Sequence, residues 1–107
     1  MKGVNNKILH VNLTDMKFSI EEPGEVFYRT YFGGRGFALK YMLENIPAGT
    51  DPLAPENMIV FAASVLVGAP GPAISRLVTC AKSPLTGAYG ESEAGGWWAP
   101  ELKKAGF

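Results

Sequence analysis

The stretch from residue 89 to 107, YGESEAGGWWAPELKKAGF, gathers the side chains with the most chemical potential. Glu91 and Glu93 lie two residues apart, so in a strand they would share one face. Gly95 and Gly96 would let a ligand approach the backbone closely, just before a helix whose first N–H groups are unpaired. This pattern predicts a site for an anion. The two tryptophans that follow would provide flat surfaces for stacking, although packing is the commoner role of tryptophan.

Arg76 begins a predicted strand directly after a loop rich in proline and glycine. A lone arginine there is usually a surface residue. Beside the Gly95–Gly96 segment it would complete a phosphate cradle, because a guanidinium matches phosphate with two hydrogen bonds. Glu91 and Glu93 would repel an anion unless they bind something else, such as the amidine-like edge of a pterin or a guanine.

Two further features have a functional and a structural interpretation. The segment GGRG, residues 33–36, would hold a phosphate through its N–H groups and Arg35, or it would form a tight turn with a surface arginine. His10 has no cysteine or second histidine nearby in the sequence, so we expect it to be structural. No Walker loop, no CxxC pair and no Ser/His/Asp arrangement is present.

Composition excludes several classes of protein. Ten basic residues balance ten acidic ones among the 107, so nothing favours nucleic-acid binding. Cys80 is the only cysteine, which excludes an internal disulfide and fits a reducing compartment. The first 14 residues lack the apolar region of a signal peptide, and the run 58–68 is too short to span a bilayer. We therefore expect a cytoplasmic domain with no membrane contact.

The hydrophobic pattern predicts the elements that would position these residues. Alternation predicts a β-hairpin of residues 7–13 and 16–22, and helical spacing follows within 23–32 and 37–46. The apolar run 58–68 predicts a strand buried on both faces. Alternation over residues 76–83 predicts another strand, with Cys80 as a small buried hydrophobe, and residues 88–92 predict a short one. A helix follows near Pro100, with Lys103 and Lys104 near its end and Gly106 as its cap. The order β-β-α-α-β-β-β-α indicates an α+β fold.

Longer segments of the sequence resemble the N-terminal domain of the aldehyde ferredoxin oxidoreductase family. The strongest matching motifs are GGRG, DPLAPEN, the spacing of Arg76 from KSPLTG, and AGG followed by ELKKAGF. The resemblance covers nearly the whole chain. It implies a β-sheet base on which a tungstopterin rests, that is, a bis-molybdopterin carrying tungsten or molybdenum. It also implies a [4Fe–4S] cluster in the full-length protein, and oxidation of aldehydes to carboxylic acids with ferredoxin as electron acceptor in anaerobes.

Carried over by motif, the resemblance implies cofactor contacts at Arg76 and in the segment Glu93, Ala94, Gly95 and Gly96, and no catalytic residue in this chain. One departure concerns Glu93, where the family commonly has asparagine. A glutamate only accepts hydrogen bonds, so it suits the donor edge of a pterin and suits a phosphate badly.

The resemblance also leads us to expect that residues 1–107 are a domain truncated at its C-terminal end and inactive alone. Its partners would be the missing C-terminal domains or another subunit, and we expect self-association through exposed apolar faces. Two alternatives stay open. One is a non-catalytic module that binds a pterin or phosphate or assists assembly. The other is part of the tungsten subunit of an aryl-CoA reductase-like complex. The sequence names neither the substrate nor the metal.

Overall fold

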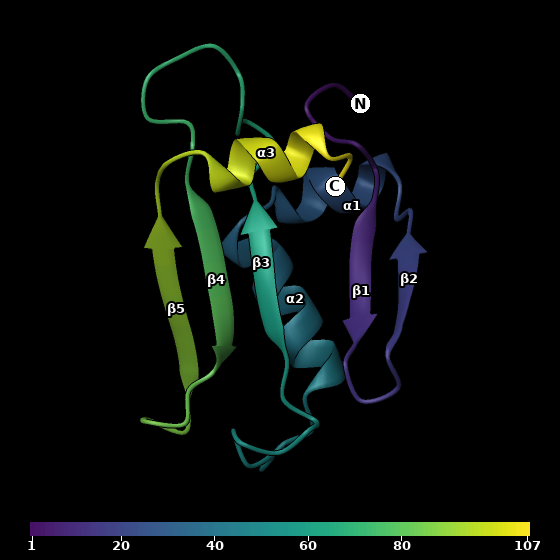
Figure 1. The fold of residues 1–107 in the computed structure, drawn as a ribbon, viewed down its shortest axis with the longest axis vertical. Coiled ribbons are helices and arrows are strands. Elements are labelled where there is room, and N and C mark those ends of the chain that lie inside the picture. The colour runs from purple at the N-terminus through teal and green to yellow at the C-terminus, as the bar shows by residue number, and fades with distance from the viewer.

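The computed structural model describes residues 1–107, which form five strands and three helices (Figure 1). In chain order these are β1 Ile8–Asn12, β2 Lys17–Glu21, α1 Glu25–Tyr31, α2 Arg35–Asn45, β3 Ile59–Ala63, β4 Leu77–Lys82, β5 Tyr89–Ala94 and α3 Trp98–Lys104. This order and the α+β class confirm the prediction. The sheet is divided, however, into a two-stranded β1–β2 hairpin and a three-stranded sheet in the order β3-β4-β5.

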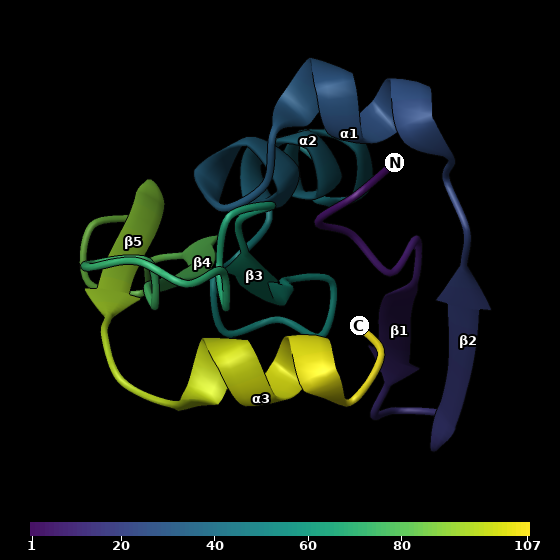
Figure 2. The same ribbon diagram turned by 90° about the horizontal axis from the view of Figure 1, so that it is seen from above.

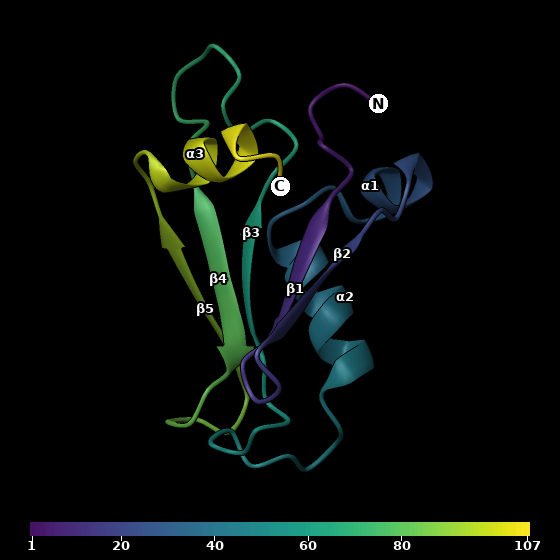
Figure 3. The same cartoon turned by 45° about the vertical axis from the view of Figure 1, so that its right-hand side comes forward.

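The hairpin is antiparallel, with Leu9 opposite Ile20 and Val11 opposite Phe18. It stands beside the edge strand β3 (Figures 1 and 3). Its apolar face points to solvent: the four side chains that share it are 42–73% exposed. We call Leu9, Val11, Phe18 and Ile20 the outer hairpin face.

The three-stranded sheet has α1 and α2 over one face and α3 over the other (Figure 2). On the first face, Ala38 and Met42 of α2 pack against Val78 and Cys80 of β4. Successive side chains of a pleated strand point to opposite faces, so Leu77 of β4 joins a second cluster under α3 with Val67 and Ala99. Cys80 is 1% exposed, which confirms its predicted burial.

The prediction that residues 58–68 form a strand buried on both faces is wrong. Only Ile59–Ala63 is a strand, and Ile59 and Phe61 are 59% and 49% exposed. The reason is that β3 is an edge strand, and α3 covers only part of the face to which Ile59 and Phe61 point. Beyond Ala63 the chain turns, and the Val67 N–H donates to the carbonyl of Ser64.

Helix α2 packs on two sides. Ala38 and Met42 face the three-stranded sheet, and Tyr41 donates a hydrogen bond to Glu21 of the hairpin. Leu43 remains 80% exposed. None of the helices combines the length and apolarity that a membrane-spanning segment needs.

Candidate cofactor-binding site

The register of β4 and β5 brings Arg76 beside the glycine turn. Leu77 is the Cα partner of Ala94, so the residue before Leu77 lies next to the residue after Ala94. Arg76 Nη1 lies 3.6 Å from Glu93 Oε2, and the arginine side chain is 65% exposed. The structure thus brings Arg76, Glu93, Ala94, Gly95 and Gly96 together at one end of the sheet.

The turn between β5 and α3 offers unpaired donors. Strand β5 runs through Glu93 and ends at Ala94, and α3 begins at Trp98. The N–H groups of Gly95, Gly96 and Trp97 donate no hydrogen bond within the chain. Gly96 is exposed and has φ +102°, and a Cβ added to it would meet nothing within 4 Å. A ligand therefore has room to approach three consecutive N–H groups.

The two tryptophans differ in their surroundings. The Trp98 ring lies 5.5 Å from the Phe61 ring, centroid to centroid, and Trp97 is 82% exposed. Trp98 thus packs on Phe61 of β3 while remaining 52% exposed, and Trp97 is the more exposed of the two tryptophans beside the turn. Pro100 lies in the first turn of α3, and Gly106 follows the helix with φ +103°, as expected.

The acids of β5 bind an arginine from a distant part of the chain. Glu91 and Glu93 share one face of the strand, as predicted, and this face looks toward α2. Arg35 Nη2 donates to Glu91 Oε1 at 2.7 Å and to Glu93 Oε1 at 2.9 Å. The charge of Glu91, and next the hydrogen bond to Glu93, raise the pKa of Arg35 further above its already high value. This pairing offsets part of the negative charge of the acid pair and so reduces the repulsion expected toward an anion.

Local spacing along the chain could not predict this pairing, because Arg35 is 56 and 58 residues away from its partners. The GGRG segment that carries Arg35 forms a tight turn. Gly33 bridges to Ser64, and the Gly34 N–H donates to the carbonyl of Ala63 at 3.2 Å. Since the Gly34 N–H is occupied within the protein, the structure favours the tight turn over a phosphate loop.

A chain of hydrogen bonds continues from Glu91 into the core. The Tyr89 hydroxyl donates to Glu91 Oε2 at 2.6 Å and lies 2.9 Å from the Cys80 sulfur. Burial raises the pKa of the Cys80 thiol. No three His, Cys, Asp or Glu side chains lie close enough to hold a metal ion. The site combines two exposed arginines, two carboxylates and the unpaired N–H groups of the glycine turn.

Comparison with known proteins decides the family. Residues 8–107 match the sequence model of the aldehyde ferredoxin oxidoreductase N-terminal domain. The chain belongs to this family. Two relatives named tungsten-containing aldehyde ferredoxin oxidoreductase, from Pyrococcus abyssi and Pyrococcus horikoshii, are 39% and 38% identical over 107 residues. The match covers 100% of this chain and 18% of each relative.

A solved structure has the same fold. It is the active site complex BamBC of benzoyl coenzyme A reductase, in complex with 1,5-dienoyl-CoA. The TM-score is 0.94 with 33% sequence identity, over 99% of this chain and 16% of the BamBC chain. The agreement confirms that residues 1–107 have the fold of the family's N-terminal domain.

Proposed function

We propose that this chain is the cofactor-holding N-terminal domain of a tungsten–pterin oxidoreductase that oxidises aldehydes to carboxylic acids with ferredoxin as electron acceptor. The names of the relatives support tungsten and the aldehyde substrate. The single observation that carries the proposal is the position of Arg76 beside the exposed turn of Gly95 and Gly96.

The residues present fit a phosphorylated pterin. Arg76 would donate to a phosphate or a pterin oxygen, since most of its side chain is exposed and a guanidinium offers five N–H donors. The N–H groups of Gly95 and Gly96 would donate to further oxygens. Ala94 contributes a small side chain that leaves the approach to the turn open.

Glu93 has a separate role in this proposal. Each of its oxygens already faces an arginine, at 2.9 Å for Arg35 and 3.6 Å for Arg76. A carboxylate has about four lone-pair sites, so Glu93 still has room to accept an N–H from the pterin ring. Glu93 would thus bind the pterin edge while the glycine turn and Arg76 take the oxygens.

The bound group would supply the two-electron redox chemistry, with tungsten as the proposed metal and molybdenum as its alternative. The residues of this chain would orient it and balance its negative charge. We assign no proton-transfer group here. The [4Fe–4S] cluster would be held elsewhere in a longer protein, because Cys80 is the only cysteine and is buried. We keep the cytoplasm of an anaerobe as the proposed compartment.

The test is the tungsten and pterin content of the gene product expressed in full. Replacing Arg76 with Ala should lower bound tungsten about tenfold, as expected when a charged hydrogen bond is lost. Arg29, an exposed arginine of α1 that pairs with Glu25, provides the matched control Arg29→Ala. Tungsten content in R76A equal to that in R29A would remove Arg76 from the site.

A second function is favoured by the fold match to BamBC at a TM-score of 0.94. The full protein would then reduce an aryl-CoA thioester within a larger complex. Assays with an aldehyde and with an aromatic CoA thioester, each with a redox dye, would separate the two functions. Loss of both activities in a protein that still binds a pterin would favour the non-catalytic module.

A further inference from the structure

Glu93 is the point at which two arginines from different elements meet. Arg35 Nη2 donates to Oε1 of Glu93 at 2.9 Å, and Arg76 Nη1 faces Oε2 at 3.6 Å. The carboxylate therefore uses a different oxygen for each guanidinium. This arrangement links Arg76, at the start of β4, to Arg35, at the start of α2.

Arg35 is held much more firmly than Arg76. The turn before Arg35 is fixed to the end of β3 by the Gly33–Ser64 bridge and by the Gly34 N–H bond to Ala63. The Arg35 guanidinium donates from the same atom, Nη2, to Glu91 and to Glu93, and Glu91 also accepts a hydrogen bond from Tyr89 at 2.6 Å. Arg76 has a single ion pair, at 3.6 Å, and follows a loop.

Without Arg35, Glu91 and Glu93 would lie two residues apart on one face with no cation between them. Two like charges this close repel each other, and Glu93 would then turn toward Arg76 or away from the strand. Either movement changes where Arg76 points. The orientation of Arg76 would thus depend on Arg35, which binds the other oxygen of the Glu93 carboxylate.

We infer that Arg35 is a positioning residue for the candidate site: it holds the Glu93 carboxylate, and Glu93 in turn holds the Arg76 guanidinium beside the Gly95–Gly96 turn. The inference rests on the proposed function, because Arg76 is given its role there. It adds a residue that reaches the cofactor only through Glu93, which faces Arg76 and is itself proposed to bind the pterin edge.

The test is a double-mutant cycle on cofactor retention in the gene product expressed in full. Protein samples are incubated, passed through a desalting column, and analysed for bound tungsten and pterin against time. The variants are R35A, R76A and the double variant, with R29A as the control for loss of an exposed arginine. R35Q is a second replacement, used if R35A fails to fold, because glutamine keeps an unbranched side chain that suits a helix. Thermal unfolding checks that each variant is folded.

We expect R76A to speed cofactor release about tenfold or more. R35A should speed it about tenfold, the scale usual for residues that orient a direct ligand. The double variant should release the cofactor more slowly than the product of the two single effects predicts, because part of the effect of Arg35 passes through Arg76.

Two results would overturn the inference while leaving the proposed function intact. One is release from R35A and R35Q at the rate of R29A. The other is effects that multiply in the double variant, which would mean that Arg35 acts independently of Arg76. Release from R76A at the control rate would instead contradict the proposed function, and the inference with it.

Discussion

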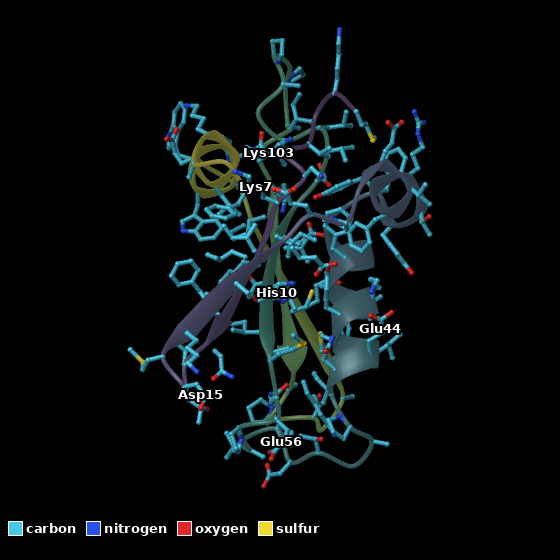
Figure 4. All side chains as sticks on the ribbon, turned by 90° about the vertical axis from the view of Figure 1, so that its right-hand side faces the viewer. Lys7, His10, Asp15, Glu44, Glu56 and Lys103 are labelled. Carbon is cyan, nitrogen blue, oxygen red and sulfur yellow. The ribbon has the colours of Figure 1, made fainter.

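Nε2 of His10 lies 2.7 Å from Oε2 of Glu21 across the β1–β2 hairpin. The same carboxylate oxygen accepts a hydrogen bond from the Tyr41 hydroxyl of α2 at 3.0 Å, and the Tyr41 ring lies 5.5 Å from the imidazole. Figure 4 shows His10 between the hairpin and α2. The polar face of the hairpin therefore faces inward, and its apolar face is left outward. His10 has the structural role that its sequence context predicted.

Tyr41 should make stability depend on pH in the alkaline range. Burial, and next the hydrogen bond to Glu21, raise the pKa of Tyr41 above the value of 10.0 for a free tyrosine. The folded protein then keeps this proton to a higher pH than the unfolded chain does. Its contribution is complete below about pH 10 and falls above it, by up to about 1.4 kcal/mol per pH unit.

The comparison of wild type with Tyr41→Phe measures this contribution. Phenylalanine should cost about 1 kcal/mol at pH 7, through the lost hydrogen bond, and should flatten the decline between pH 10 and 11. Urea unfolding at each pH gives both quantities. Equal slopes for the two proteins would contradict the role of Tyr41.

The outer hairpin face should drive self-association of the 107-residue chain. Val11 and Phe18 face each other across the hairpin and are 58% and 73% exposed. Replacing both with Thr keeps a strand-forming residue and removes apolar surface. Sedimentation velocity should then show less concentration-dependent association than for wild type. Leu43→Gln is the control, since Leu43 is exposed elsewhere, on α2; an equal effect there would contradict a specific face.

Gly33 should tolerate no side chain. It has φ +97°, and an added Cβ would lie 2.8 Å from Ser64 Cα and 2.9 Å from the carbonyl oxygen of Ala63. Gly24 has a similar φ of +86° and nothing within 4 Å. Gly24→Ala should cost about 1 kcal/mol of unfolding free energy, from the backbone alone.

Gly33→Ala should cost about 2 kcal/mol more than Gly24→Ala, because backbone atoms must also move. Denaturant unfolding of both variants measures the difference. Similar losses of unfolding free energy at the two positions would contradict the prediction, because the backbone around the Gly33–Ser64 bridge would then shift at little cost.

Cys80 should react slowly with a thiol reagent. It is 1% exposed, and burial raises the pKa of its thiol, so little thiolate is available for attack. Labelling with DTNB should be slow in the folded protein and fast in urea. Complete reaction of the folded protein within the mixing time would contradict the burial of Cys80.

Local patterns in the sequence were sufficient to predict the order of elements. Alternation predicted the hairpin and β4, and the proline, lysine and glycine positions of α3 predicted the helix near the end of the chain. These signals depend on neighbours along the chain, so they survive without knowledge of the tertiary fold. The burial of a strand depends on which other elements pack against it. The exposure of the Ile59 and Phe61 side chains was missed for that reason.

The candidate site was also predictable only in part. The glycine pair, Glu93 and Arg76 are noticeable by type and spacing, and the pairing of β4 with β5 brings them together. The role of Arg35 was missed because it depends on where α2 begins relative to β5. The available signal was an unexplained pair of acids on one strand face, together with Arg35 in the loop before the predicted helix 37–46.

The most direct measurement of the central claim is a crystal structure of the gene product, expressed in full and loaded with its cofactor. The decisive quantity is the distance from the Arg76 guanidinium to the nearest phosphate or pterin oxygen. We expect a hydrogen bond of about 3.2 Å or less, with the N–H groups of Gly95 and Gly96 directed at the same group. A cofactor whose nearest atom lies beyond about 6 Å from Arg76, outside the range of a close charge contact, would contradict it.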